Sequence, residues 1–150
     1  VRIQVRERVP VAVVPYERGY AVVDAVGTVV EVTEQRPPLM LISERGRRVA
    51  WVAPGHEIPS PAVREGLAIL RVMPEGLRGE VAHLQVTPDR EVFLYTVDGL
   101  EIRAGPLRGL RQRLAAAPEI LRAVRALGGR LEYVDLSLAD QIIIKPRASP

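Results

Sequence analysis

Cysteine is absent from this sequence of 150 residues. Its absence excludes disulfide bonds, thiol catalysis and thiolate metal ligands, and it is compatible with either side of a membrane. No run approaches the roughly 18 apolar residues of a membrane span, and the first residues lack the charged and then apolar pattern of a secretion signal. Because the chain begins with Val1 and not with methionine, we expect a fragment, whose lack of targeting segments says nothing about the parent protein.

Aromatic residues are also scarce, at 4% of the sequence, and Lys145 is the single lysine among 21 basic residues. The 18 acidic residues leave a net charge of only +3. Arginine clusters such as Arg45, Arg47 and Arg48 lack the interleaved aromatic residues of a base-stacking platform, so nucleic-acid binding is not indicated. With 47% hydrophobic and 26% charged residues, the composition is ordinary for one globular domain with its own core.

The first part of the chain predicts short strands joined by tight turns. Residues 1–5 alternate between apolar and polar side chains, as in a strand with one buried face. Pro10 interrupts this pattern before an apolar run at residues 11–14, because proline cannot donate a hydrogen bond to a sheet. Residues 20–33 predict a hairpin, and residues 39–42 predict another short strand.

Two helices are predicted. Ser60 is suited to the N-cap of the first helix, Pro61 to its first position, and Pro74 ends it. The second helix has apolar residues at spacings of three and four over residues 107–124. Pro118 lies in its middle, where proline would cost an unbroken helix about 3 kcal/mol, so we expect a kink or a restart there.

Between and after the helices the sequence predicts further strands. Residues 81–86, 91–97 and 100–104 form a meander, and Asp98-Gly99 is a strong two-residue hairpin signal. Together the elements predict an α+β fold. It is a largely antiparallel sheet of short strands with two helices packed on one side, ending in a C-terminal β-hairpin.

The C-terminal hairpin carries the most informative pattern. Residues 131–138 alternate with a period near two, and residues 139–141 form a short polar turn. Ile142, Ile143 and Ile144 then place apolar groups on both faces of a second strand, and both faces must be covered. Neighbours within the domain or a strand donated by another polypeptide could cover them. Burial would stabilise either arrangement by roughly 1.5 to 3 kcal/mol per isoleucine, so this energy does not distinguish cover by the domain itself from cover by a donated strand.

Convergent catalytic groups are scarce. His56 lies in a turn and His83 in a strand, and these two lone histidines have no cysteine partner and no zinc-binding spacing. Ser60 is explained as a helix cap, and no serine lies in a nucleophile elbow. We therefore predict a protein that is not an enzyme, with no catalytic, cofactor-binding or metal-binding residues and no cofactor.

Four stretches of the sequence carry a family resemblance. They are Val-Arg-Glu-Arg-Val-Pro-Val-Ala at residues 5–12, Gly-Tyr-Ala-Val-Val-Asp at residues 19–24, the meander at residues 94–105 and Tyr-Val-Asp-Leu at residues 133–136. In this order and spacing they resemble the extracytoplasmic β-domain of the FtsQ/DivIB family of bacterial cell-division proteins.

The resemblance implies a domain organisation and a location. Residues 1–10 would be the end of a POTRA-like strand and a junction, residues 11–146 the β-domain, and residues 147–150 a frayed tail. The POTRA domain and the membrane anchor are absent from the sequence. The parent would be anchored by one membrane span, with this domain on the extracytoplasmic face of the cell membrane, periplasmic or external, at the division septum.

The resemblance also implies a function. The chain would be a non-catalytic divisome interaction domain that binds FtsB (DivIC)/FtsL-type partners by β-augmentation on its last strand, and so helps to assemble or regulate septal cell-wall synthesis. The family pattern has an arginine where Ser137 stands and often an aromatic residue where Leu138 stands. The implied partner-binding residues are Arg90, Ser137, Leu138, Asp140, Gln141, Ile142, Ile143, Ile144 and Lys145.

Two other functions are compatible with the residues. One is a structural envelope module unrelated to division, which an upstream membrane span and POTRA-like domain in the parent would argue against. The other is a hydrolase of unfamiliar type, which would need a pocket that joins His83 to an acidic residue.

Overall fold

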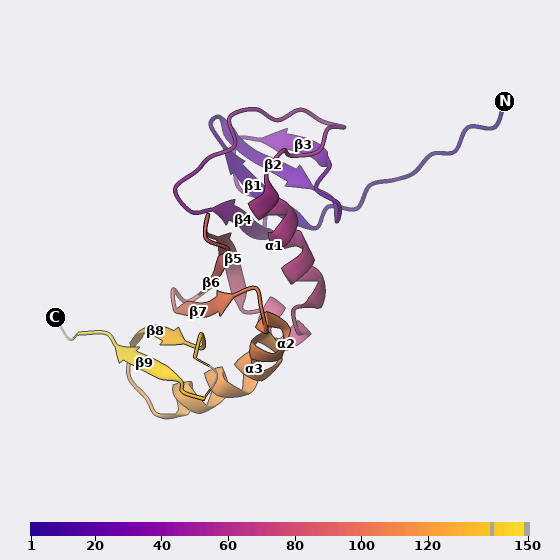
Figure 1. Ribbon diagram of the computed structural model, residues 1–150. Coiled ribbons are helices and arrows are strands. Elements are labelled where there is room, and N and C mark those ends of the chain that lie inside the picture. Colours follow the sequence, from indigo (N-terminus) through magenta and orange to yellow (C-terminus); the bar gives the residue numbers. More distant parts are fainter. Residues whose placement is uncertain (139, 149–150) are drawn as a thin grey trace.

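A nine-stranded sheet forms the body of the molecule in the computed structural model, which describes residues 1–138 and 140–148. The strands lie in the spatial order β3-β2-β1-β4-β5-β6-β7-β8-β9 (Figure 1). Their bounds are β1 Ala12–Tyr16, β2 Gly19–Val23, β3 Val29–Thr33, β4 Met40–Glu44, β5 Val81–Val86, β6 Glu91–Thr96, β7 Glu101–Pro106, β8 Leu131–Asp135 and β9 Ile143–Pro146.

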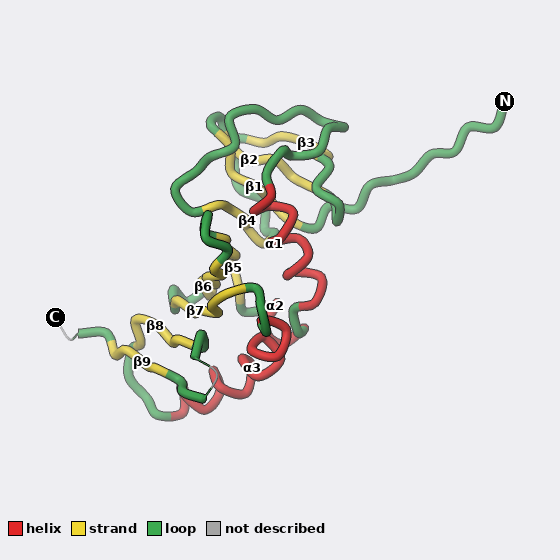
Figure 2. Tube along the Cα trace, viewed as in Figure 1, coloured by secondary structure: helices red, strands yellow, loops and turns green. Residues whose placement is uncertain are grey.

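Three helices accompany the sheet: α1 Pro61–Val72, α2 Glu75–Arg78 and α3 Leu110–Ala126. The pairs β1–β4, β4–β5 and β7–β8 are parallel, and parallel neighbours need a crossover connection. Helices α1 and α3 lie in the crossovers from β4 to β5 and from β7 to β8, which advance in the same direction along the sheet. Because such crossovers are right-handed, both helices cover one face (Figures 1 and 2). The predicted α+β architecture is confirmed.

The helices agree with the prediction in part. The capping signal of α1 is confirmed, because the Ser60 side chain accepts a hydrogen bond from the Val63 amide at 3.3 Å. Helix α3 is continuous from Leu110 to Ala126, so the restart at Pro118, one of the two alternatives that we expected, does not occur. Its buried stripe packs on the sheet, and this tertiary packing outweighs the local cost of proline. No sequence signal predicts the single turn of α2.

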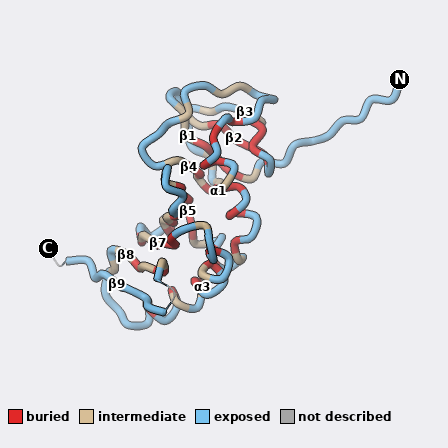
Figure 3. The backbone as a smooth tube through the Cα atoms, viewed as in Figure 1, coloured by how far each residue is buried: buried red, intermediate tan, exposed pale blue. Residues whose placement is uncertain are grey.

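The core lies between the sheet and its helices. Leu84 of β5, Leu67 of α1 and Leu114 of α3 are buried in one continuous hydrophobic cluster. Figure 3 shows buried residues along the surfaces where strands and helices face one another. Gly66 brings α1 very close to β4, because a Cβ atom at this position would lie 2.4 Å from Ile42 Cγ2.

The N-terminal segment, residues 1–11, carries no assigned strand, and its first residues run away from the domain (Figure 1). The strand predicted for residues 1–5 is not formed, since no other strand of the described chain pairs with it. Two contacts hold the end of the segment at the sheet: Val11 is half-buried and its amide donates to Val23 O at 2.9 Å, and Arg8 forms an ion pair. Arg8 Nη1 lies 2.9 Å from Asp24 Oδ2, and Asp24 is buried in the turn between β2 and β3.

The C-terminal hairpin is shorter than the prediction. Strand β8 ends at Asp135 instead of residue 138, because the Asp135 carboxylate accepts a hydrogen bond from the Ser137 amide at 2.8 Å and turns the chain. Strand β9 begins at Ile143, one residue later than expected. Ala139 of the predicted turn and residues 149–150 of the predicted frayed tail lie outside the described residues.

Candidate functional site

Strand β9 occupies one edge of the sheet and pairs with β8 alone within the described chain. The register places Ile143 opposite Asp135, Ile144 opposite Val134 and Lys145 opposite Tyr133. The other side of β9 therefore presents backbone amides and carbonyls that no strand of residues 1–138 or 140–148 covers. Such an edge is the structural requirement for addition of a strand from another polypeptide.

The side chains of this edge are incompletely buried. Ile142 is 49% exposed and Ile143 is 42% exposed, whereas Ile144 is half-buried and packs against the core. Neighbours within the described chain therefore cover the strand only in part, and cover by a strand from another polypeptide stays a prediction. Figure 3 shows the C-terminal hairpin as largely exposed.

A cavity of about 540 Å³ lies between α3 and the segment that joins β8 to β9. Five of the predicted partner-binding residues come together in its lining, so the structure gathers them at one place beside the open edge. These five are Ser137, Leu138, Asp140, Gln141 and Ile142. The lining also includes Leu136 and residues of α3 and the loop before it, which are Gly109, Gln112, Arg113, Ala116 and Ile120.

Backbone contacts fix the position of Ser137 at this cavity. The Leu136 amide donates to Arg103 O at 2.8 Å, which carries the chain past the end of β7. Gly105 has φ 83°, and a Cβ atom there would lie 2.8 Å from the Ser137 Cβ. Glycine is therefore required at residue 105 both for its backbone conformation and for the close approach of Ser137.

Arg113 braces the wall of the cavity. Its guanidinium donates to Ala104 O at 2.6 Å, to Arg108 O at 2.8 Å and also to Pro106 O. Burial lowers the pKa of Arg113. Three backbone carbonyls thus hold the loop between β7 and α3 against the first turns of the helix.

The charged groups on β8 and β9 pair with one another. Lys145 Nζ lies 3.1 Å from Glu132 Oε2 across the hairpin. The Arg103 guanidinium stacks over the Tyr133 ring at 3.6 Å from its centroid. Arg103 Nε also donates to Glu101 Oε2 at 2.9 Å, and this hydrogen bond raises the pKa of Arg103.

Ile143, Ile144 and Lys145 lie on β9 outside the cavity lining, and Arg90 is the predicted site residue that lies neither in the cavity nor on β9. It lies in the turn between β5 and β6 with φ 63°, and its Nη1 is 3.4 Å from Glu65 Oε1 of α1. The register of β6, β7, β8 and β9 places this turn at the same end of the sheet as the start of β9. Strands β7 and β8 separate the two positions.

The α3 residues of the cavity were missed by the sequence-based prediction. Gln112, Ala116 and Ile120 follow one another at intervals of four, so they share one face of the helix. This spacing was the available signal. The spacing predicts that these three residues form a stripe next to the buried face of α3. It does not predict that this stripe contacts the C-terminal hairpin.

The constellation required by the hydrolase hypothesis is not formed. His83 Nε2 lies 2.6 Å from Ser43 Oγ, and no carboxylate hydrogen-bonds to His83 in the part of the chain that the structure describes. Burial, with the nearby charge of Arg36, lowers the pKa of His83 to about 4. His56 contacts the edge of the Trp51 ring, with the ring centroids 5.7 Å apart.

Residues 1–138 and 140–148 contain no group of three or more His, Cys, Asp or Glu side chains that could hold a metal ion. No helix among them is long and apolar enough to cross a membrane.

Comparisons with known proteins agree with one another. The family model described as "Cell division protein FtsQ/DivIB, C-terminal" matches residues 12–137. The search of curated proteins gives no match. Among solved structures, the chain is similar to the major extracytoplasmic domain of the trans isomer of the cell division protein DivIB from Geobacillus stearothermophilus. The TM-score is 0.53 at 20% sequence identity, and the alignment covers 81% of this chain and 97% of that one.

Proposed function

Because the chain belongs to the FtsQ/DivIB family of bacterial cell-division proteins, and thus has a role in division, we propose that it is a non-catalytic interaction domain of the divisome. It binds FtsB (DivIC)/FtsL-type partners, which add a strand to β9, and so helps to assemble or regulate septal cell-wall synthesis. The observation that carries this proposal is the open edge of β9 with its exposed isoleucines.

The edge offers two kinds of binding energy to an added strand. Each backbone hydrogen bond formed along β9 contributes about 0.5 to 1.5 kcal/mol. Covering the exposed parts of Ile142 and Ile143 contributes about 1 kcal/mol each. Backbone pairing provides affinity, whereas the cavity beside Ser137 and Leu138 provides a pocket for a partner side chain and hence specificity.

Two charged residues extend this surface. Lys145 lies on β9, and Arg90 lies at the same end of the sheet as the start of that strand. Each already faces a carboxylate across an exposed pair, Glu132 and Glu65 respectively. A partner carboxylate therefore competes with an existing contact, and such exposed pairs contribute about 0 to 1 kcal/mol. We assign these residues to orientation of the partner more than to affinity.

The test is calorimetric titration of the 150-residue chain with the partner ectodomains. Ile143→Lys places a charge in the covered interface, so we expect binding to weaken at least tenfold, about 1.4 kcal/mol. Val32→Lys is a matched control, because Val32 is also 42% exposed and lies on β3, the opposite edge of the sheet. It should leave binding unchanged.

Folding of both variants is checked by circular dichroism. Unaltered binding by Ile143→Lys, or an equal loss in Val32→Lys, argues against β9 as the docking strand. An unfolded Ile143→Lys variant would mean that the strand is internal. Ile142→Lys lies just outside β9 and supplies a second folded probe of the same surface.

The domain organisation follows as part of the same proposal. Residues 1–10 are the end of a POTRA-like strand and a junction, residues 11–146 are the β-domain, and a single span anchors the parent so that this domain is extracytoplasmic at the septum. The likeness to an extracytoplasmic domain supports this location. The gene of the parent protein tests it: sequence before Val1 should encode one membrane span followed by a POTRA-like domain. A parent without them would favour an envelope module unrelated to division.

A further inference from the structure

A second concave surface lies far from β9, at the end of the sheet where β1, β4 and β5 begin. It is a groove of about 990 Å³, which is large enough to hold several side chains of a ligand. Its walls come from the connection between β3 and β4, the C-terminal half of α1, α2 and the start of β5. The start of β9 lies at the opposite end of the strands, so the groove is independent of the candidate partner-binding edge.

The floor of the groove is apolar and preformed. Met40 and Leu67 line it as buried side chains, and Leu39 is half-buried. Pro37 and Pro38 form one wall, where two consecutive proline rings restrict the backbone. A wall that is already ordered loses little conformational entropy when a ligand binds.

Three arginines surround this apolar floor, and no acidic residue lines it within the described chain. Arg36 donates to Ala82 O at 2.6 Å, and Arg78 donates to Leu70 O at 2.8 Å. Backbone carbonyls satisfy hydrogen bonds but do not neutralise positive charge. Neither these two arginines nor Arg71 forms an ion pair with a carboxylate of the described residues.

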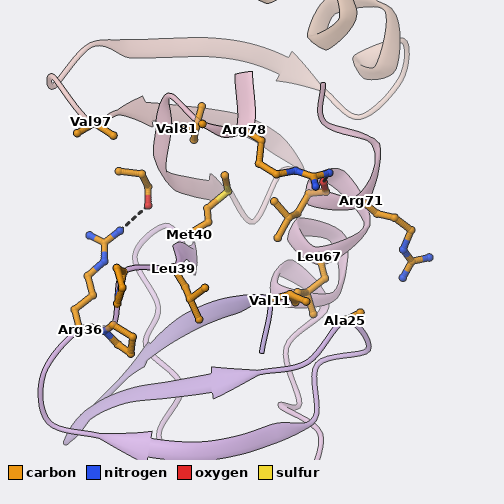
Figure 4. Close-up of a pocket in the computed structure, with 15 residues that line it drawn as sticks. Val11, Ala25, Arg36, Leu39, Met40, Leu67, Arg71, Arg78, Val81 and Val97 are labelled. Atoms are coloured by element: carbon orange, nitrogen blue, oxygen red, sulfur yellow. Dashed lines mark hydrogen bonds between the residues drawn. The ribbon is translucent and has the colours of Figure 1, made fainter. Parts of the chain in front are cut away.

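The positive groups lie on two sides of the groove. In Figure 4, Arg36 lies on one side, Arg71 and Arg78 lie on the other, and Leu39 and Met40 lie between them. A ligand that complements both sides needs an anionic group at each end and an apolar middle. A fatty acid has one anionic end and can satisfy only one side. An extended peptide with acidic residues flanking apolar ones satisfies both.

We propose that this groove binds an extended acidic peptide segment of a protein partner, with apolar side chains on Leu39 and Met40 and carboxylates facing Arg36 on one side and Arg71 and Arg78 on the other. The segment binds separately from any strand added to β9, because the two surfaces do not overlap. The domain thus has a second docking site. This site recognises the positions of acidic residues in the peptide and does not depend on backbone pairing with a strand.

The test uses the 150-residue chain and three probes in an NMR titration. The first is acetyl-Asp-Leu-Val-Leu-Asp-amide, the second is the same peptide with Asn in place of both Asp residues, and the third is decanoate. We expect saturable shifts of the Leu39, Met40 and Leu67 amides with the acidic peptide and roughly tenfold weaker binding of the Asn peptide. Raising the salt concentration from about 0.05 to 0.3 M should weaken the acidic peptide further.

Charge-reversal variants localise the effect. Arg36→Glu and Arg71→Glu should each weaken the acidic peptide about three- to tenfold, whereas Arg122→Glu on α3 makes the same change in net charge away from the groove and should have no effect. Arg71 makes no hydrogen bond that would be lost within the described residues, so this variant stays informative if Arg36→Glu unfolds. Equal binding of both peptides, no binding, or tighter competitive binding of decanoate would each overturn the proposal.

Discussion

Gly66 lies in the middle of α1, where helix propensity alone favours replacement by alanine by about 1 kcal/mol. The structure reverses that expectation. An alanine Cβ would lie 2.4 Å from Ile42 Cγ2 and 3.3 Å from Leu84 Cδ2, and the branched Ile42 side chain cannot withdraw within a packed core. Close contact between α1 and the sheet therefore depends on the absence of a side chain.

We expect Gly66→Ala to lower the free energy of unfolding by about 1 to 3 kcal/mol, measured by urea denaturation. Gly76→Ala in α2 is the matched control, because the nearest atom to its new Cβ is 3.9 Å away. It should leave stability within about 1 kcal/mol of the parent or increase it. A Gly66→Ala variant as stable as the control would contradict the close packing of α1 on β4.

The lowered pKa of His83 makes the stability of the folded protein depend on pH. Its pKa is about 4 in the folded protein, where burial and then Arg36 disfavour the charged ring, and about 6.5 in the unfolded chain. The unfolded state therefore binds more protons between these values, and stability falls as pH is lowered from about 6.5 to 4. Since the ring is only half-buried, we expect a loss on the order of 1 kcal/mol after allowance for solvent screening.

Comparison with His83→Gln isolates this effect, since glutamine can still hydrogen-bond to Ser43. Unfolding free energies of both proteins are measured at pH 7 and pH 4.5. The parent should lose more stability than the variant over this range. Asp24 and Asp98, whose pKa values are lowered from 3.8, change charge below the range and do not interfere. Identical slopes in the two proteins would show that His83 titrates normally.

At the scale of elements, an ion pair between Arg8 and Asp24 holds the part of the N-terminal segment that precedes Val11. Burial of Asp24 opposes its ionisation, but hydrogen bonds from Thr28, Arg8 and Val26 outweigh burial and lower the pKa of the carboxyl group. Two of these bonds, from the Thr28 amide at 2.9 Å and the Val26 amide at 3.1 Å, shape the turn itself. The third, from Arg8, sets the direction from which the segment approaches β1.

We expect Arg8→Ala to raise hydrogen exchange of the Val11 amide, which donates to Val23 O at 2.9 Å, severalfold. The lost stability should be less than about 1 kcal/mol, because the Arg8–Asp24 pair is partly exposed. Arg6→Ala, an exposed arginine of the same segment with no ion pair in the described chain, is the control and should change neither quantity. Equal exchange in the two variants would show that the ion pair does not anchor the segment.

Strand β9 contributes no fully buried side chain to the core of the domain. Ile144 is its one half-buried isoleucine, and the remaining apolar side chains of the strand and its approach stay largely exposed. A chain that ends at Gln141 should therefore remain folded and lose only about 1 to 3 kcal/mol. Thermal unfolding followed by circular dichroism tests this. A truncated chain that does not fold would assign β9 to the core and would weaken its assignment to partner binding.

At the scale of the whole molecule, the two surfaces proposed to bind partners lie apart. The cavity beside β9 lies between α3 and the C-terminal hairpin, whereas the arginine-rimmed groove lies at the far end of the strands near α1 and α2. One continuous sheet connects them, with β9 and β3 at its two edges. A partner strand on β9 and a peptide in the groove can therefore bind at the same time without contact.

Sequence patterns alone determined the local elements of this protein. Ser60 and Pro61 specify where α1 begins, and Asp98-Gly99 specifies the turn between β6 and β7, because caps and tight turns depend on neighbouring residues. The three isoleucines before Lys145 likewise predicted a strand with apolar side chains left to cover.

Tertiary structure alone decided how these elements meet. The insertion of β4 between β1 and β5, the passage of α3 through Pro118 and the joining of α3 residues with Ser137 in one cavity depend on contacts between residues far apart in the chain. Local patterns carry the period of an element but not the identity of its neighbours, because burial is a property of the packed whole. For the same reason, only the assembled sheet shows that β9 has one paired side and one open side.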